Sequence, residues 1–476
     1  MTGFAEYEDY DGLGLAELAR NGEVTAEEIL GAAVERMEAR NPKLNAVVRP
    51  MIDAAQNTVA AGVPDGPFAG VPFLLKDLGV FYNGVPTTSG SRLFADFIPD
   101  HDSTLVERFR AAGLVIMGKT NTPELGINAS TEPVLHGPTH NPWAAGHSPG
   151  GSSGGAAAAV SARILPMAHA TDGGGSIRIP AANCGLFGLK PTRARNPTGP
   201  DLGEGWSGFS CGHAVTRSVR DSAALLDATA GPAPGDPYWA PAPEGRFLDA
   251  VGADPGRLRI ALSTAAPNGV PVHADCVRAA EQAAALCEDL DHVIEEAAPA
   301  FDMERAIATM RVIWSSNLWV GLNLRYQALG RETDGSDVER ITWLLAQEGR
   351  AKSATDYARA LQIIHKTGRD FAAFFETYDV ALTPTMAQPP WPFGIIDMMG
   401  DDLEAYFDTL FSHMPATAQY NMTGQPAASV PLYWNDAGLP IGVQFAGRFG
   451  DEATLFKLSA PLEQARPWAE RKPALD

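Results

Sequence analysis

Cysteine, basic residues and long apolar runs are all scarce in this sequence. Its 476 residues include only four cysteines, Cys184, Cys211, Cys276 and Cys287, with no CxxC spacing among them. This excludes a disulfide scaffold and predicts buried free thiols in a reducing compartment. The 36 lysines and arginines face 57 aspartates and glutamates, which gives a net charge of −21. Nucleic acids and anionic membranes would therefore be repelled.

No segment is suited to export or to crossing a membrane. The first residues, MTGFAEYEDYDG, are acidic and lack the basic and apolar regions of a signal peptide. The small-residue run 154–168 is interrupted by Arg163 and is too short to span a bilayer. We therefore expect a cytoplasmic protein with no membrane or nucleic-acid partner. Its hydrophobic content of 45% is enough to form a large core.

Short apolar runs alternate with helical patterns, which predicts an α/β fold with helices on both faces of a sheet. Thr25 and Glu28 have the spacing of a capping box, so we expect a helix from there to about residue 39, ended by Asn41 and Pro42. Residues 70–75 predict a buried strand with Lys76 at its end. Further helices are expected at 103–112, 156–162, 273–290, 302–330 and 336–376, and further strands at 114–117, 258–262, 292–296, 379–383 and within 421–445.

Residues 228–256 are rich in proline, glycine and alanine. Such a composition is typical of a surface connection, and this segment is the best candidate for an internal boundary. The chain contains no internal repeat and no low-complexity tract.

Residues 113–120 match GxxxxGK[ST], the pattern of a phosphate-binding loop, with Lys119 as its lysine. The positions between the two glycines are Leu, Val, Ile and Met, which are typical of a buried strand. A strand followed by a turn is therefore the favoured interpretation. Nucleotide binding through Lys119 is a remote alternative.

Two further patterns carry little weight. GxSxG occurs at 150–154, centred on Ser152 and, one residue later, on Ser153, but the residues before it have a loop composition, whereas a nucleophile elbow follows a strand. His136 and His140 are four residues apart, yet the Gly-Pro pair between them excludes a shared helix face. We therefore expect loop histidines and no metal site.

Three consecutive glycines, residues 173–175, are followed directly by Ser176. Without side chains, their N–H groups can turn toward one point, which is what an oxyanion requires. Ser176 would then lie beside these donors, where a nucleophile belongs. Judged by these residues alone, a glycine turn packed on a helix explains the segment equally well.

The longer sequence around these glycines resembles the amidase signature family. The signature is matched by GGSSGGAAAAV at 150–160 and by ATDGGGSIRIPAANCGLFGLKPT at 170–192, and similar stretches occur at 68–78, 118–126, 130–133, 141–143 and 424–431. The resemblance covers most of the chain outside 228–375. It implies a single domain over 1–476, with a central mixed β-sheet flanked by helices on both faces, and no cofactor.

The resemblance implies a catalytic triad of Ser176 as nucleophile, Ser152 as a bridging serine after a cis peptide bond, and Lys76 as base. It places the oxyanion hole at the amides of Gly173, Gly174, Gly175 and Ser176. The supporting groups are the side chains of Ser153, Asp172 and Arg178. We expect Asp172 and Arg178 to brace the loops through hydrogen bonds and ion pairs. Binding of a substrate carboxylate by Arg178 is the alternative.

The chemistry of lysine agrees with this role for Lys76. Lysine acts as a base only when it is neutral, and its pKa of about 10.4 in water falls on burial. Lys76 ends an apolar run, and Lys119, in a similarly apolar segment, is the competing candidate. An ion pair with Asp77 or another acidic residue is the alternative role for Lys76. The family's GTDTGGS stretch is ATDGGGS here, so Gly173 lacks a side chain but keeps its N–H.

Specificity in this family lies outside the signature, and we expect a variable pocket region at about residues 300–400. The candidate pocket residues are Ile127, Asn128, Trp206, Phe209, Trp319 and Trp391. The aromatic residues among them offer apolar walls, which favours hydrophobic or aryl amides, with esters and carbamates (urethanes) as further substrates. The chain most resembles the bacterial branch with 6-aminohexanoate cyclic dimer hydrolase, aryl acylamidases and urethane-cleaving amidases.

A small amide, ester or carbamate is the only partner that the resemblance implies, and we expect a monomer or a homodimer. Two other functions stay open. The amidase subunit of a glutamyl-tRNA amidotransferase shares the triad but works with partner subunits. A non-catalytic binding protein of the same fold is disfavoured because all three triad positions are occupied.

Overall fold

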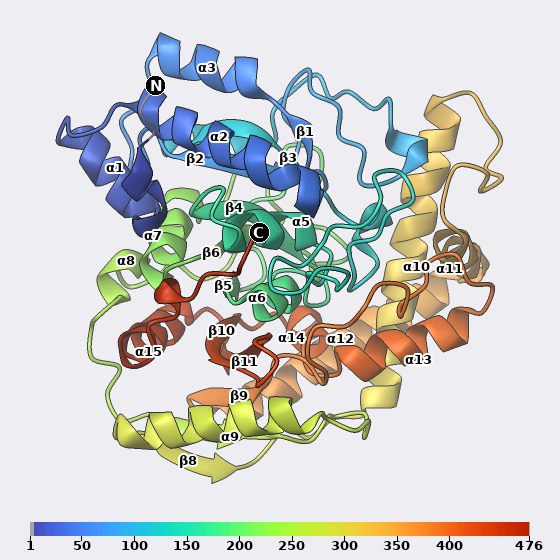
Figure 1. Ribbon diagram of the computed structural model, residues 1–476. Coiled ribbons are helices and arrows are strands. Elements are labelled where there is room, and N and C mark those ends of the chain that lie inside the picture. Colours follow the sequence, from blue (N-terminus) through green and yellow to red (C-terminus); the bar gives the residue numbers. More distant parts are fainter. Residues whose placement is uncertain (1–3, 476) are drawn as a thin grey trace.

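Residues 4–475, which the computed structural model describes, contain eleven strands in two sheets (Figure 1). The smaller sheet has the order β1-β3-β2, with β1 at Val47–Pro50, β2 at Pro72–Lys76 and β3 at Val115–Thr120. The larger sheet has the order β4-β6-β5-β10-β11-β9-β7-β8. Its strands are β4 Met167–Asp172, β5 Phe187–Lys190, β6 Cys211–Thr216, β7 Arg259–Leu262, β8 Val293–Glu296, β9 Val380–Pro384, β10 Ala427–Trp434 and β11 Pro440–Gly447.

Helices surround both sheets. They are α1 Gly12–Arg20, α2 Ala26–Leu44, α3 Ile52–Ala61, α4 Thr104–Ala111, α5 Gly154–Ser161, α6 Arg178–Cys184, α7 Val219–Thr229, α8 Phe247–Ala250, α9 Ala274–Asp289, α10 Met303–Ala328, α11 Arg340–Ala351, α12 Ala354–Phe375, α13 Leu403–His413, α14 Ala418–Thr423 and α15 Glu452–Ala465. Short 3₁₀ turns lie at Ala5–Asp9, Arg92–Phe94, Glu124–Gly126 and Trp468–Glu470. No helix within residues 4–475 combines the length and the apolar character needed to cross a bilayer.

The larger sheet is mixed, as the resemblance implies. Along the sheet from β4 through β6, β5, β10 and β11 to β9, each pair of neighbouring strands is antiparallel. Strand β7 pairs parallel with both β9 and β8. The segment 228–256 contains the short helix α8 and leads to β7. Because β7 joins the same sheet as β4 and β6, the chain on both sides of this segment contributes to one sheet.

Alternation along β11 shows how the two faces of the larger sheet are covered. Val443 and Phe445 belong to the core that includes residues of α7, α9 and α15. A Cβ on Gly442, the residue before Val443 and therefore on the opposite face, would lie 2.6 Å from Ala182 Cβ of α6. Successive strand residues point to opposite faces, so α6 covers one face while α7, α9 and α15 cover the other. The fold is therefore an α/β fold with helices on both faces.

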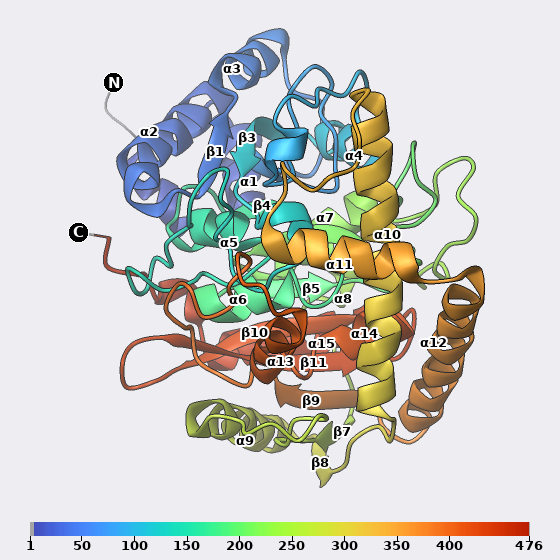
Figure 2. The ribbon, with the colours of Figure 1, turned by 90° about the vertical axis from the view of Figure 1, so that its right-hand side faces the viewer.

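Helix α5 lies at the centre of the molecule and consists of small residues that are all buried (Figure 2). A Cβ on Gly155 would lie only 2.4 Å from the Asn121 nitrogen, just after β3. Only glycine permits this close approach of helix and chain. The sequence-based expectation of a central small-residue helix is confirmed, and it fixes the serines that precede α5.

Two expected helix boundaries are wrong. Helix α2 continues past Pro42 to Leu44, because the side-chain oxygen of Asn41 accepts from the backbone of Ala46 and Val47 and closes the last turn. The single helix expected over 336–376 is two helices, α11 and α12. Their junction is a capping box in which Ser353 caps the start of α12.

Helices α10 to α13 cover one side of the molecule, where α11 crosses the long helix α10 (Figure 2). A Cβ on Gly349 of α11 would lie 2.0 Å from the Ser315 carbonyl of α10, so the crossing depends on glycine. This layer faces the glycine-rich segment after β4 and forms the wall of the cavity described below.

Candidate active site

Lys76 and Ser152 are in direct contact inside the protein. Lys76, the last residue of β2, places Nζ 2.7 Å from Ser152 Oγ and 2.9 Å from Thr171 Oγ1. Lys76 is fully buried and Ser152 is 2% exposed. The peptide bond between Gly151 and Ser152 is cis, as the resemblance implies. Such a pair can exchange a proton without competing bulk water.

The pKa of Lys76 is strongly perturbed. Burial lowers it from 10.5 to about 7, and the negative charge of Asp172 acts in the opposite direction. A lysine with this pKa is partly neutral near pH 7. It can therefore accept a proton from Ser152 under physiological conditions.

Lys119, the competing candidate, has a different environment. It faces Leu75 in the register between β2 and β3, so its side chain and that of Lys76 point to opposite faces of the small sheet. Its Nζ donates to the Pro86 carbonyl at 3.0 Å and lies 3.6 Å from Asp77 Oδ1. Residues 115–120 form strand β3 rather than a loop, which removes the geometry of a phosphate-binding loop.

Ser153 connects the two halves of the site. Its hydroxyl donates to the Thr171 carbonyl at 3.2 Å, at the end of β4. Its backbone N–H donates to the Ser176 carbonyl at 3.3 Å. The Ser152–Ser153 segment, which precedes α5, and the Ser176 segment, which follows β4, therefore lie side by side.

The glycine loop 173–175 is organised by Asp172. The N–H of Gly175 donates to Asp172 Oδ1 at 2.7 Å, and the N–H of Ile177 donates to Oδ2 at 3.1 Å. The Gly175 amide is therefore occupied, which corrects its expected place in the oxyanion hole. Within residues 4–475, the backbone N–H groups of Gly173, Gly174 and Ser176 have no such partner.

Arg178 holds Asp172 in place. Both residues are fully buried, and the guanidinium binds both carboxylate oxygens at 2.9 and 3.0 Å. Its other N–H groups donate to the Thr417 carbonyl, Gln444 and Asn421. Burial alone would raise the pKa of Asp172, but the charges of Arg178 and Lys190 and the hydrogen bonds from Arg178 and Asn421 together hold that pKa well below its usual range. With its donors in use, Arg178 braces the loop.

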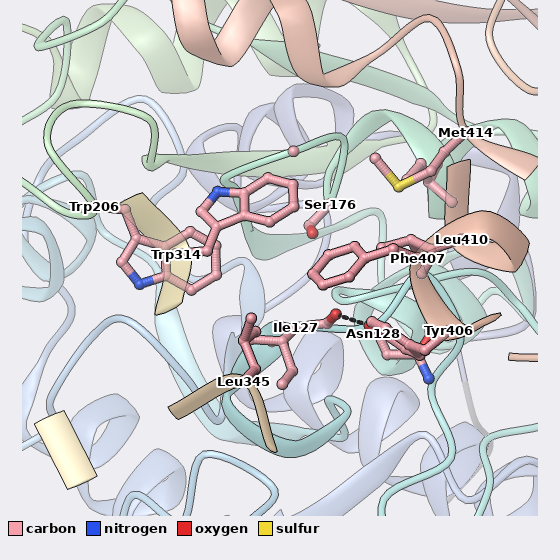
Figure 3. A pocket seen from close by; sticks show the side chains of 14 residues that line it. Ile127, Asn128, Ser176, Trp206, Trp314, Leu345, Tyr406, Phe407, Leu410 and Met414 are labelled. Carbon is pink, nitrogen blue, oxygen red and sulfur yellow. Dashed lines mark hydrogen bonds between the residues drawn. The ribbon is translucent and has the colours of Figure 1, made fainter. Parts of the chain in front are cut away.

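Ser176 lies at a cavity with an empty volume of about 440 Å³. Figure 3 shows Ser176 among Trp314 of α10, Phe407 of α13 and Met414. The lining residues are Gly126, Ile127, Asn128, Ala129, Gly174, Ser176, Ile179, Trp206, Trp314, Leu345, Tyr406, Phe407, Leu410 and Met414. None of these lining side chains is charged. The Tyr406 hydroxyl is bonded to the Ile127 carbonyl, so it is not free.

Three of the six expected pocket residues, Ile127, Asn128 and Trp206, line this cavity, and the other three do not. The Phe209 side chain is fully buried in the same core cluster as Trp314 and Phe407 but does not reach the cavity. Trp319 packs on Trp343, and the guanidinium of Arg350 lies over its ring. The ring centroids of Trp391 and His413 are 4.9 Å apart. Periodicity places an aromatic residue on a helix or loop but does not tell which buried surface it faces.

The sequence analysis missed the contribution of α13 to the cavity. Tyr406, Phe407 and Leu410 lie on one face of this helix, at i, i+1 and i+4. The apolar pattern of residues 403–413, capped by Asp402, was the available signal for this helix.

The two loop histidines and the four cysteines take no part in the site. His136 Nε2 lies 3.0 Å from Thr88 Oγ1, whereas His140 Nδ1 accepts from the Gly146 amide, so the two rings have separate partners. All four cysteines are free and buried, as expected. Across residues 4–475, His, Cys, Asp and Glu side chains form no group of three that could hold a metal ion.

Two serines, a buried lysine and a loop with free amides define a site for acyl transfer. The chain belongs to the amidase family, whose model, described as Amidase, matches residues 28–456. It is therefore an amidase, a hydrolase of amide C–N bonds.

The chain is similar to relatives over nearly its whole length. It is 36% identical over 477 residues to the 6-aminohexanoate-cyclic-dimer hydrolase of Paenarthrobacter ureafaciens, covering 98% of this chain and 96% of the relative. It is 36% identical over 473 residues to an acylamidase of Rhodococcus erythropolis, covering 96% of each chain. A solved structure of 6-aminohexanoate cyclic dimer hydrolase superposes with a TM-score of 0.93 at 35% identity, covering 98% of this chain and 99% of the other.

Proposed function

We propose that this amidase works through an acyl-enzyme formed on Ser176, with Ser152 as proton relay and Lys76 as base. One observation carries the proposal: Nζ of Lys76, fully buried, lies 2.7 Å from Ser152 Oγ. Ser176 is on the neighbouring segment and is partly exposed to the cavity, whereas Ser152 is buried. This arrangement suits a nucleophile that meets substrate and a relay that does not.

The proposed reaction is a relay of protons between these three residues. Neutral Lys76 takes the proton of Ser152, and Ser152 takes the proton of Ser176 as its oxygen attacks the amide carbonyl. The free N–H groups of Gly173, Gly174 and Ser176 stabilise the oxyanion of the tetrahedral intermediate. The protons return along the relay to the leaving amine, and water then hydrolyses the acyl-enzyme.

The cavity favours an uncharged, hydrophobic or aryl acyl group. Its walls are largely aromatic and aliphatic, and they include no charged side chain within the described residues. A charged group would lose its hydration there without gaining a partner. We propose hydrophobic and aryl amides as substrates, with esters and carbamates (urethanes) as further substrates because their carbonyls meet the same nucleophile. The names of the two relatives, an acylamidase and a cyclic-dimer hydrolase, agree with amide substrates.

The alternative is the amidase subunit of a glutamyl-tRNA amidotransferase. Its substrate, glutamine, carries an α-ammonium and an α-carboxylate, each of which needs a charged or strongly polar partner. The cavity lining offers neither, which favours the small-amide hydrolase. A glutaminase assay of the purified chain separates the two functions.

The proposal is tested with chromogenic anilides, aryl esters and aryl carbamates. We expect wild type to release product, Ser176→Ala to abolish release, and Ser152→Ala and Lys76→Ala to reduce it by at least about 10³-fold. Ser336→Ala, an exposed serine, is the matched control and should have wild-type rates. Persistent turnover in Ser176→Ala would refute the assigned nucleophile, and glutamine hydrolysis without anilide hydrolysis would favour the alternative.

A further inference from the structure

The indole of Trp206 occupies the space that a side chain at position 173 would fill. A Cβ on Gly173 would lie 3.0 Å from Trp206 Cε3 and 3.1 Å from Cζ3, and the Trp206 ring supplies every atom within 4 Å. Gly173 does not have a positive φ, so its backbone accepts a side chain. The obstacle to a larger residue at position 173 is therefore Trp206 itself.

The turn that carries Trp206 is strained. Trp206 and Ser207 have φ values of +51° and +53°, and Gly208 follows at +80°. Non-glycine residues rarely adopt this left-handed region, and two in succession need support from the surrounding structure. Gly205 closes the turn by accepting from the amides of Gly208 and Ser210, each at 3.1 Å.

Groups outside the cavity provide that support. The Ser207 hydroxyl is hydrogen-bonded to the Tyr357 hydroxyl of α12, and Asn317 Nδ2 of α10 donates to the same phenol oxygen at 3.2 Å. Arg193 Nε donates to the Gly208 carbonyl at 2.8 Å. The turn is thus held at Ser207 and Gly208 by side chains that do not line the cavity.

Trp206 also bounds the cavity beside the nucleophile. It lies next to Trp314, with ring centroids 6.0 Å apart, and both rings line the cavity with Ser176 (Figure 3). Trp314 lies against the next glycine in the same way, because a Cβ on Gly174 would be 3.3 Å from its Cζ2. Two indoles therefore pack directly on the glycine loop and limit the room for the acyl group.

We propose that Gly173 and Trp206 are a matched pair that determines which acyl groups enter the cavity, and that Tyr357 positions Trp206 from outside it. The proposal rests on the proposed acyl-enzyme function and concerns its specificity. The missing side chain at 173 lets the indole pack against the glycine loop at the wall of the cavity. A planar acyl group such as benzoyl packs on this indole, whereas a larger one such as naphthoyl competes with it for space.

A double-mutant cycle tests the pair with acetyl, benzoyl and naphthoyl anilides. Gly173→Thr should lower kcat/KM for the benzoyl anilide by at least about tenfold, because the displaced indole enters the acyl space. Trp206→Ala should raise the naphthoyl-to-benzoyl ratio of kcat/KM by about tenfold. In the double variant, Gly173→Thr should cause less than about a threefold loss, because the indole it displaces is gone. An undiminished loss there would show a defect of the loop itself and overturn the proposal.

The positioning role of Tyr357 has its own test. Tyr357→Phe removes only the hydroxyl that holds Ser207, and it should shift the naphthoyl-to-benzoyl ratio in the direction of Trp206→Ala. Tyr378→Phe, which removes a phenol bonded to Glu295 on another part of the chain, is the control and should leave the ratio unchanged. An unchanged ratio in both Trp206→Ala and Tyr357→Phe, with acetyl anilide still hydrolysed, would overturn the specificity pair alone. A wild type that hydrolyses none of the three anilides would overturn the proposed function with it.

Discussion

The pH dependence of the reaction gives the most direct test of Lys76. Burial lowers the pKa of Lys76 from 10.5 to about 7, and only the neutral amine can take the proton of Ser152. We therefore expect kcat/KM to rise with pH along a single ionisation with a midpoint near 7. At pH 6 it should be about a tenth of its plateau value, because one pH unit below the pKa leaves about a tenth of the amine neutral.

The lowered pKa of Lys76 also makes the stability of the fold depend on pH. The folded protein binds fewer protons than the unfolded chain between pH 7 and 10.5, so stability rises with pH across this window. The fall of the pKa from 10.5 to about 7, at 1.36 kcal/mol per pKa unit, means that the buried lysine lowers the free energy of unfolding by about 4 kcal/mol at pH 7, where half of it is protonated in the folded state. Lys76→Met should therefore raise Tm at pH 7 while turnover is lost, and the gain should disappear above pH 10.5.

Kinetics from pH 5.5 to 9.5 and thermal unfolding of the variants check this reasoning. The pair Lys119 and Asp77 is the control, because burial also lowers the pKa of Lys119, to about 8. The double variant Asp77→Asn/Lys119→Met neutralises that pair and should leave the kinetic midpoint near 7. A pH-independent rate, or full activity in Lys76→Arg, whose guanidinium stays charged, would refute Lys76 as the base.

Three further predictions concern other parts of the structure. Gly175 has φ +138°, and a Cβ there would lie 2.6 Å from Thr417 Oγ1, so Gly175→Ala should abolish activity and lower Tm. Gly394 has φ +80° with nothing within 4 Å of an added Cβ, so Gly394→Ala should lower the free energy of unfolding by only about 1 kcal/mol in denaturant titrations. Arg195→Met should cost about 3–5 kcal/mol, because it leaves Glu452, buried and bonded to Arg195 at 2.8 Å, without its partner; equal Tm values would contradict this. Burial raises the pKa of Glu339 from 4.5 to about 7, so the folded state binds more protons between these values and stability falls as pH rises through them; Glu339→Gln should raise Tm at pH 8 but not at pH 4.5.

Local sequence patterns were informative about the elements and about the reactive residues. The apolar run before Lys76 and the small residues after Ser153 predicted a buried strand and a buried helix, and both are present. Such elements are recognisable because burial selects composition and period at each position of a short segment. The pattern failed at Pro42, because the side chain of the preceding Asn41 accepts from the amides of Ala46 and Val47 and closes the helix beyond the proline.

The choice between the two buried lysines depended on tertiary structure. Lys76 is the last residue of β2 and Lys119 the last but one of β3, and burial lowers both pKa values. The parallel register of β2 and β3 sends them to opposite faces, one to Ser152 and the other to Asp77. Sequence cannot reveal this difference, because register is a relation between strands that are distant along the chain.

By itself, the sequence determined the class of fold, the residues able to react and the glycine loop beside Ser176, since these depend on composition and motifs within short segments. Tertiary structure alone decided which loop amide is already bound to Asp172, which aromatic rings reach the cavity, and that Gly173 makes room for Trp206. Each of these is a contact between segments far apart in the chain. Their geometry follows from how helices and sheets pack, which no local pattern encodes.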